Sequence, residues 1–86
     1  MKRLSLLHDD APQQLDYVVL PFGLGRFAVS TWGGRHVAFA IGFGAAWFAI
    51  RMDAGDICPS VWMIDVAGSL AVVPNFDWTT PLPEEA

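Results

Sequence analysis

The sequence predicts a mainly β protein, and three features carry that prediction. Large and small side chains alternate from Val37 to Gly44, a glycine pair occupies positions 33–34, and a second apolar hairpin pattern surrounds positions 67–68. A period of two is typical of strands, whose successive side chains point to opposite faces, and glycine accepts the positive φ angles of tight turns. We therefore expect a small antiparallel sheet, sandwich or open barrel of about five or six strands built from two hairpins, with turns at 33–34 and 67–68.

The first hairpin joins a strand at 26–32 to the alternating strand that follows Gly33-Gly34. A two-residue turn predicts the cross-strand pairs Arg26 with Ile41, Phe27 with Ala40, Ala28 with Phe39, Val29 with Ala38 and Ser30 with Val37. Phe27 and Phe39 then each lie beside an alanine, which leaves room for dense packing. Both faces of this hairpin are apolar, so we expect each to be covered, by the same chain or by another.

Shorter elements are expected on either side of this hairpin. At residue 9 or 10, an acceptor side chain followed by Pro12 predicts at most a short helical turn near 10–15. A strand at 15–20 follows, which Pro21 ends or confines to a sheet edge. The segment 2–7 is either a strand or a fraying terminus.

Alternation of large side chains predicts a third strand at 47–52. The second hairpin is expected to pair Trp62 with Val73 and Ile64 with Ala71 around 67–68. Phe39, Phe43 and Trp47 also follow the i, i+4 spacing of a helix, but the glycines at 42 and 44 favour strand.

The chain encodes more apolar surface than a domain of this size buries. Of its 86 residues, 53% are hydrophobic and only 16% are charged, whereas small domains bury roughly 60 to 65% of their unfolded surface. The excess predicts an interface, and we expect a homo-oligomer, in the simplest case a homodimer. We expect one β domain at 1–80 and an extended acidic tail at 81–86.

Charge is distributed unevenly, with net +2 up to Arg51 and −6 after it. One lysine and four scattered arginines do not form a phosphate-binding patch, so we expect no nucleic acid partner. The acidic half fits either ordinary solvated carboxylates or a protein partner with a basic surface.

No secretion signal is expected, because the apolar run at 4–7 is too short. The uncharged stretch 36–50 is shorter than the ~20 residues of a spanning helix. We therefore expect a cytoplasmic protein, with membrane association through 36–50 as an alternative.

The sequence lacks a recognisable catalytic, metal or nucleotide motif. Cys58 is the only cysteine and is expected to be a buried, inert thiol; a nucleophilic role assisted by His8 or His36 has no supporting signature. Gly23 and Gly25 do not form a phosphate-binding loop, because no lysine follows them and a strand is expected where such a loop needs a helix. We expect no cofactor, no bound metal and no enzyme activity.

Candidate partner-binding residues are aromatic, arginine or acidic side chains in turns and in the tail. Trp32 beside Arg35 suggests a cation-π pair or an anchor for another protein, and the tail mixes aromatic residues with prolines and ends in carboxylates. The full set is Trp32, Arg35, Trp47, Asp77, Trp78, Leu82, Glu84 and Glu85. Phe76 and Trp78 are expected to pack mainly on the domain itself.

These observations favour a non-catalytic, self-associating protein-protein interaction module that binds and modulates or inhibits a larger protein. The alternatives are a small membrane-associated protein and a small enzyme or ligand carrier with a pocket between sheet faces.

Overall fold

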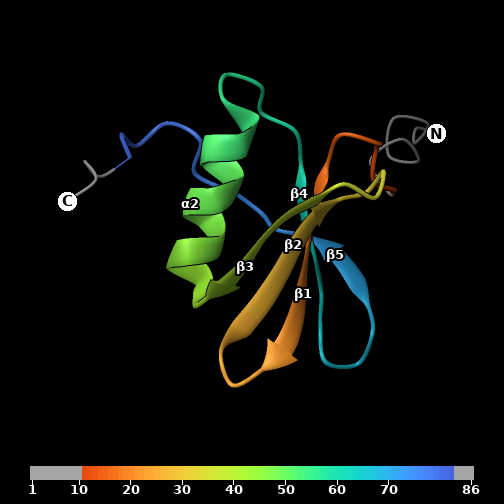
Figure 1. Cartoon of the computed structure of the whole chain (residues 1–86). Helices are drawn as coiled ribbons and strands as arrows, with labels where there is room; N and C mark the ends of the chain where they lie inside the picture. Colours follow the sequence, from red (N-terminus) through yellow and green to blue (C-terminus); the bar gives the residue numbers. More distant parts are fainter. Residues whose placement is uncertain (1–10, 83–86) are drawn as a thin grey trace.

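Residues 11–82 fold into a five-stranded mixed sheet with one helix (Figure 1). The computed structural model describes residues 11–82. Its strands are β1 (Tyr17–Gly23), β2 (Arg26–Thr31), β3 (His36–Ile41), β4 (Val61–Ile64) and β5 (Leu70–Val72), and its helix is α2 (Phe43–Ala54). They are ordered β3-β2-β1-β4-β5 in the sheet. The expected mainly β class with two hairpins is confirmed.

The first hairpin has the predicted register over most of its length. Arg26 pairs with Ile41, Phe27 with Ala40, Ala28 with Phe39 and Val29 with Ala38, but Ser30 pairs with His36 and not with Val37. The loop has three residues, closed by a hydrogen bond of 2.9 Å from Thr31 N to Arg35 O, and its glycine at position 34 has φ 105°. A bulge at Val37 absorbs the extra loop residue, which is why the register beyond it matches a two-residue turn.

The second hairpin uses the same kind of loop without a compensating bulge. Asp65 N donates to Ser69 O at 3.0 Å, Gly68 N donates to Asp65 O at 2.9 Å, and Gly68 has φ 88°. Trp62 therefore pairs with Val72, one residue from the predicted partner, and Ile64 pairs with Leu70. The hairpin is confirmed and its predicted register is wrong by one residue.

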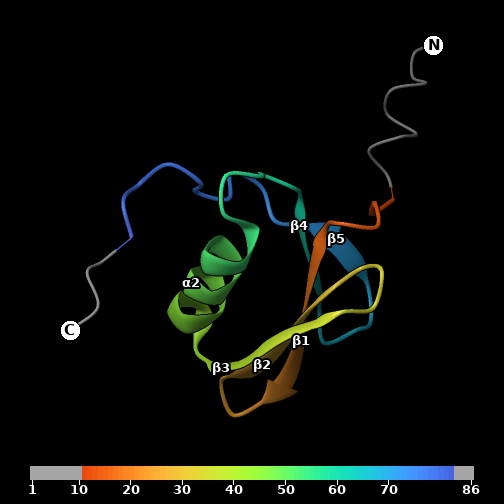
Figure 2. The ribbon, with the colours of Figure 1, turned by 45° about the horizontal axis from the view of Figure 1, so that its top comes forward.

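The predicted strand at 47–52 is wrong, because these residues belong to α2. Ala46, Ile50 and Ala54 recur at i, i+4 spacing and are all buried against the sheet. Gly42, with φ 89° and ψ 157°, is the N-cap residue outside the helix, so it does not weaken the helix interior. The helix lies over the part of the sheet made by β2 and β3 (Figure 2).

A parallel pair at the centre of the sheet was not predicted. β1 runs parallel to β4, with Tyr17 beside Val61 and Val19 beside Met63. The pairing with β4 covers only residues 17–19, so β1 continues through Pro21 to Gly23 on the β2 side alone. Pro21 thus lies where β1 is locally an edge, and its missing N–H costs no sheet hydrogen bond.

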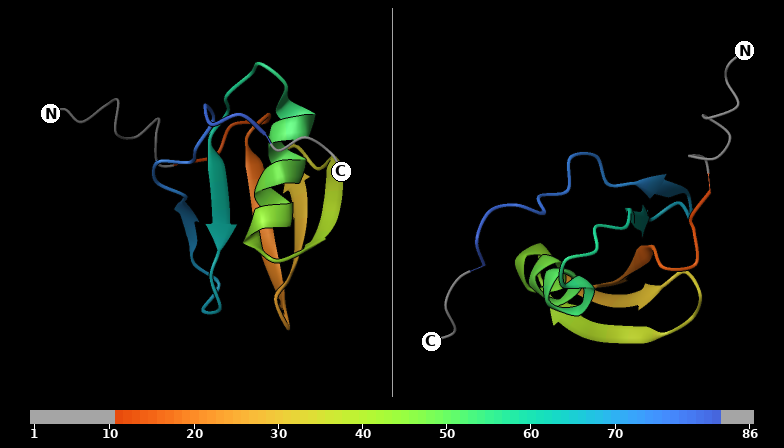
Figure 3. Two further views of the ribbon diagram at one scale, coloured as in Figure 1. Left: turned by 90° about the vertical axis from the view of Figure 1, so that its left-hand side faces the viewer. Right: turned by 90° about the horizontal axis from the view of Figure 1, so that it is seen from above.

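The core lies between α2 and one face of the sheet (Figure 3). Its fully buried side chains are Val19, Val29, Ile50 and Val61, and Phe76 and Trp78 pack against its margin as expected. Within 11–16, a hydrogen bond of 3.0 Å from Asp16 N to Gln13 O closes a turn. The segment 2–7, predicted as a strand or a fraying terminus, lies outside the described residues.

None of the described helices is long and apolar enough to cross a membrane.

Candidate interaction surface

One face of the sheet carries no described helix or strand over it. α2 packs on the face formed by Val19, Val29 and their neighbours, and alternation along the paired strands places the next residues on the other side. We call this side the open sheet face. Its apolar members are Val18, Leu20, Phe22, Ala28, Phe39, Ile41, Trp62, Ile64, Leu70 and Val72. Figure 3 shows α2 on one side of the sheet, and among residues 11–82 no helix or strand lies over the other side, where Val18 and Trp62 are buried and the side chains toward β3 are exposed.

Large apolar side chains project from β3 and from the end of β1 on this face. Phe39 is 70% exposed, Ile41 is 78% exposed and Phe22 is 55% exposed. The rings of Phe22 and Phe39 lie 5.9 Å apart, and the His36 ring lies 4.8 Å from Phe39. Across the strands, Phe39 is followed by the small Ala28 and then by Leu20, so a ridge borders a shallower centre. These apolar groups form one contiguous surface in water.

A buried carboxylate fixes the other end of the open sheet face. Asp16 is only 6% exposed and accepts hydrogen bonds from Gln13 N at 2.8 Å, Ser60 N at 3.0 Å and the Trp62 indole N–H at 3.1 Å. These bonds join the start of β1 to the start of β4 and hold the indole beside Val18. At this end of the face the Asp16 carboxylate is therefore buried and fully hydrogen-bonded.

A groove lies on the opposite side, between α2 and the β4/β5 hairpin. It has a volume of about 430 Å³, and the apolar side chains that line it include Phe43, Trp47, Met63, Ala71, Val73 and Pro74, with Asp65 and Ser69 at the same site. Aromatic rings continue from it along the helix, with Phe43 5.3 Å from Trp47 and Trp47 5.3 Å from Phe76. The groove offers mainly apolar contact, and the carboxylate of Asp65 accepts hydrogen bonds from Ala67 N and Ser69 N within its own turn.

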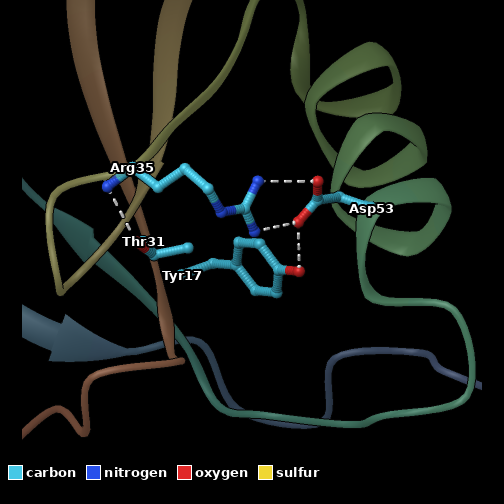
Figure 4. A network of polar contacts seen from close by, with 4 residues as sticks. All are labelled: Tyr17, Thr31, Arg35 and Asp53. Atoms are coloured by element: carbon cyan, nitrogen blue, oxygen red, sulfur yellow. Dashed lines mark hydrogen bonds and ion pairs between the residues drawn. The ribbon is translucent and has the colours of Figure 1, made fainter.

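A polar network closes the end of α2 against the first hairpin (Figure 4). Arg35 binds both oxygens of Asp53, at 3.0 Å and 2.7 Å, and the Tyr17 hydroxyl donates to the same carboxylate at 2.7 Å. Burial, followed by the hydrogen bond to Asp53, raises the pKa of Tyr17 to about 12, while Arg35 and then Tyr17 lower the pKa of Asp53. Every group here has a partner, so the network joins elements and leaves no free acid or base.

The predicted pair in the first turn is not brought together as expected. Trp32 is 49% exposed, but the Arg35 guanidinium binds Asp53 on α2 instead of lying on the indole. Arg35 is therefore held within its own chain, while Trp32 remains available to a partner.

The predicted tail residues lie beside the helix. Trp78 packs on Phe76 at 4.7 Å, and its carbonyl accepts a hydrogen bond from Arg51 at 3.2 Å. Leu82 and Trp47 line a hollow on α2 together with the exposed Asp77. Hydrogen bonds from Thr80 and Thr79 lower the pKa of Asp77, and these bonds order its own loop. Glu84 and Glu85 lie outside the described residues.

Sequence reasoning missed the residues that dominate the open sheet face. Phe22, Phe39 and Ile41 are not among the predicted partner-binding residues, although the apolar faces of the first hairpin were a signal for Phe39 and Ile41. No sequence pattern indicates the buried role of Asp16, because its hydrogen-bond partners Ser60 and Trp62 are distant in sequence.

The described residues hold no group of three or more potential metal ligands. The prediction that Cys58 is buried is wrong: it is exposed, in the connection between α2 and β4. No protein-family model, curated protein or solved structure matches the chain.

Proposed function

We propose that this chain is a non-catalytic protein-protein interaction module that acts in the cytoplasm through its open sheet face. One observation carries the proposal: a five-stranded sheet has an apolar face with Phe39 and Ile41 more than two-thirds exposed. The largest contiguous apolar patch on a soluble monomer is typically about 300 to 600 Å², and such a patch is often an interaction site.

The acidic residues contribute less to this surface than their number suggests. Asp16 is buried and fully bonded, Asp53 is neutralised by Arg35, and Asp65 and Asp77 each accept hydrogen bonds from their own loops. The contact with a partner is therefore assigned to apolar side chains, with charge confined to the margin.

Affinity capture from the native host tests this proposal. The bait is the wild-type chain, compared with Phe39→Lys on the open sheet face and with Val66→Lys, which changes a 99% exposed residue in the β4/β5 loop. We expect proteins captured by the wild type, including untagged copies of this chain, to be lost with Phe39→Lys and retained with Val66→Lys. Capture of the same proteins by both variants would contradict an interaction through this face.

A further inference from the structure

We infer that the partner of the open sheet face is a second copy of this chain, and that two copies pack face to face as a two-fold β-sandwich. This inference rests on the proposed function, because it names the partner of the same surface. Three properties of the face support it: its exposed area, its lack of exposed carboxylate and its shape.

The exposed area matches what a stable dimer needs. Taking about 200 Å² for a fully exposed large apolar side chain, the exposed fractions on this face correspond to on the order of 600 Å² of apolar surface. Standard protein interfaces bury about 800 Å² per partner, and somewhat more than half of that is apolar. The open sheet face therefore supplies the apolar part of one complete interface.

Charge placement suits a contact between identical surfaces. Each copy has a net charge of −4, so unspecific contact between copies is repulsive. The only acidic residue at the open sheet face, among those that the structure describes, is the buried Asp16, whose oxygens are occupied by Gln13, Ser60 and Trp62. Two such faces meet without placing exposed carboxylates opposite one another, and the exposed Arg26 stands at the end of β2, where it can remain in water.

The shape of the open sheet face allows it to pack against the same face of a second copy. The ridge is formed by Phe39 and Ile41 on β3 with the ring of Phe22, from the end of β1, beside Phe39, whereas the centre carries Ala28 and the half-buried Leu20. A two-fold axis brings the same patch of both copies together, so the ridge of one copy can lie over the shallow centre of the other. Interdigitation of this kind is what two sheets packed about 10 Å apart require.

Sedimentation equilibrium of the full chain at 1 to 100 μM tests the inference. We expect the wild type to approach twice its 9.4 kDa mass. Ala28→Lys, at the centre of the face and away from the edge strand β3, and Phe39→Lys, on the ridge, should each raise the dissociation constant at least about 100-fold. Val66→Lys should leave it unchanged, and far-UV circular dichroism of each variant reports whether the fold is retained.

Three other results of the sedimentation experiment would overturn the inference. A monomeric wild type refutes it, while the capture experiment can still support a different protein partner for this face. A dimer that Phe39→Lys dissociates but a folded Ala28→Lys preserves indicates pairing along the edge of β3 instead of face-to-face packing. A dimer that survives both substitutions places the interface elsewhere. If Ala28→Lys does not fold, Phe39→Lys and Leu20→Lys repeat the test.

Discussion

Replacing Asp16 by alanine should destabilise the protein more than any other removal of a single described carboxylate. The side chain is 6% exposed and accepts hydrogen bonds from Gln13, Ser60 and Trp62. A hydrogen bond to a charged group contributes about 1.5 to 3 kcal/mol, and a stranded buried donor costs about 1 to 3 kcal/mol. Because part of the freed backbone can reach water, we expect Asp16→Ala to lower the free energy of unfolding by about 4 kcal/mol.

Urea denaturation followed by tryptophan fluorescence measures this loss, at one fixed protein concentration because association shifts apparent stability. Asp65→Ala is the matched control: it removes an exposed carboxylate that accepts hydrogen bonds from Ala67 N and Ser69 N within its own turn, and should cost about 1 kcal/mol. A loss below about 1 kcal/mol for Asp16→Ala, or equal losses for both variants, would refute the reasoning that the Asp16 bonds hold β1 to β4.

Two further predictions concern the polar network and the start of α2. The chain has one tyrosine, so absorbance at 295 nm should report the ionisation of Tyr17 at about 12; its contribution to stability is present below pH 10 and lost as the pH rises toward 12. Asp53→Ala should lower this pKa, and an unchanged value would contradict the assigned hydrogen bond. Gly42→Ala should destabilise by about 1 to 3 kcal/mol because only glycine readily adopts its backbone angles, whereas Gly44→Ala, with free space around it, should stabilise by about 0.4 to 1 kcal/mol; thermal denaturation giving both the same sign would contradict this contrast.

The first hairpin could be predicted because its determinants are local. Alternation and the glycine pair specify two antiparallel strands, and the pairing of Arg26 with Ile41 follows. The exception at Ser30 arises from a three-residue loop and a bulge at Val37, which compensate one another. In the second hairpin the same loop type has no compensating bulge, so the whole register moves by one residue.

The helix could not be placed because one apolar stretch contains both periodicities. Residues up to Ile41 alternate as a strand, and from Phe43 the spacing of Ala46 and Ile50 is helical. Gly42 was counted against a helix, but it lies at the junction, where a helix interior penalty does not apply. A boundary of this kind depends on tertiary packing against β2 and β3.

The candidate surface differs from the residues predicted for it. Excess apolar content predicted apolar side chains at the surface or in an interface, yet the choice of Trp32, Arg35 and Trp47 followed residue type. The structure assigns Arg35 to an internal ion pair and Trp47 to the margin of the core. Which aromatic residue faces solvent depends on where α2 lies, and that information is not local.

Isotope-filtered nuclear Overhauser spectroscopy on a mixture of labelled and unlabelled chains tests the central claim most directly. If the open sheet face is covered by a second copy, contacts between copies should link the Ile41 methyl groups and the Phe39 ring to protons of Leu20 and Ala28. Contacts between copies that involve only Val66 or Met52, or no contact at 100 μM, would contradict this account.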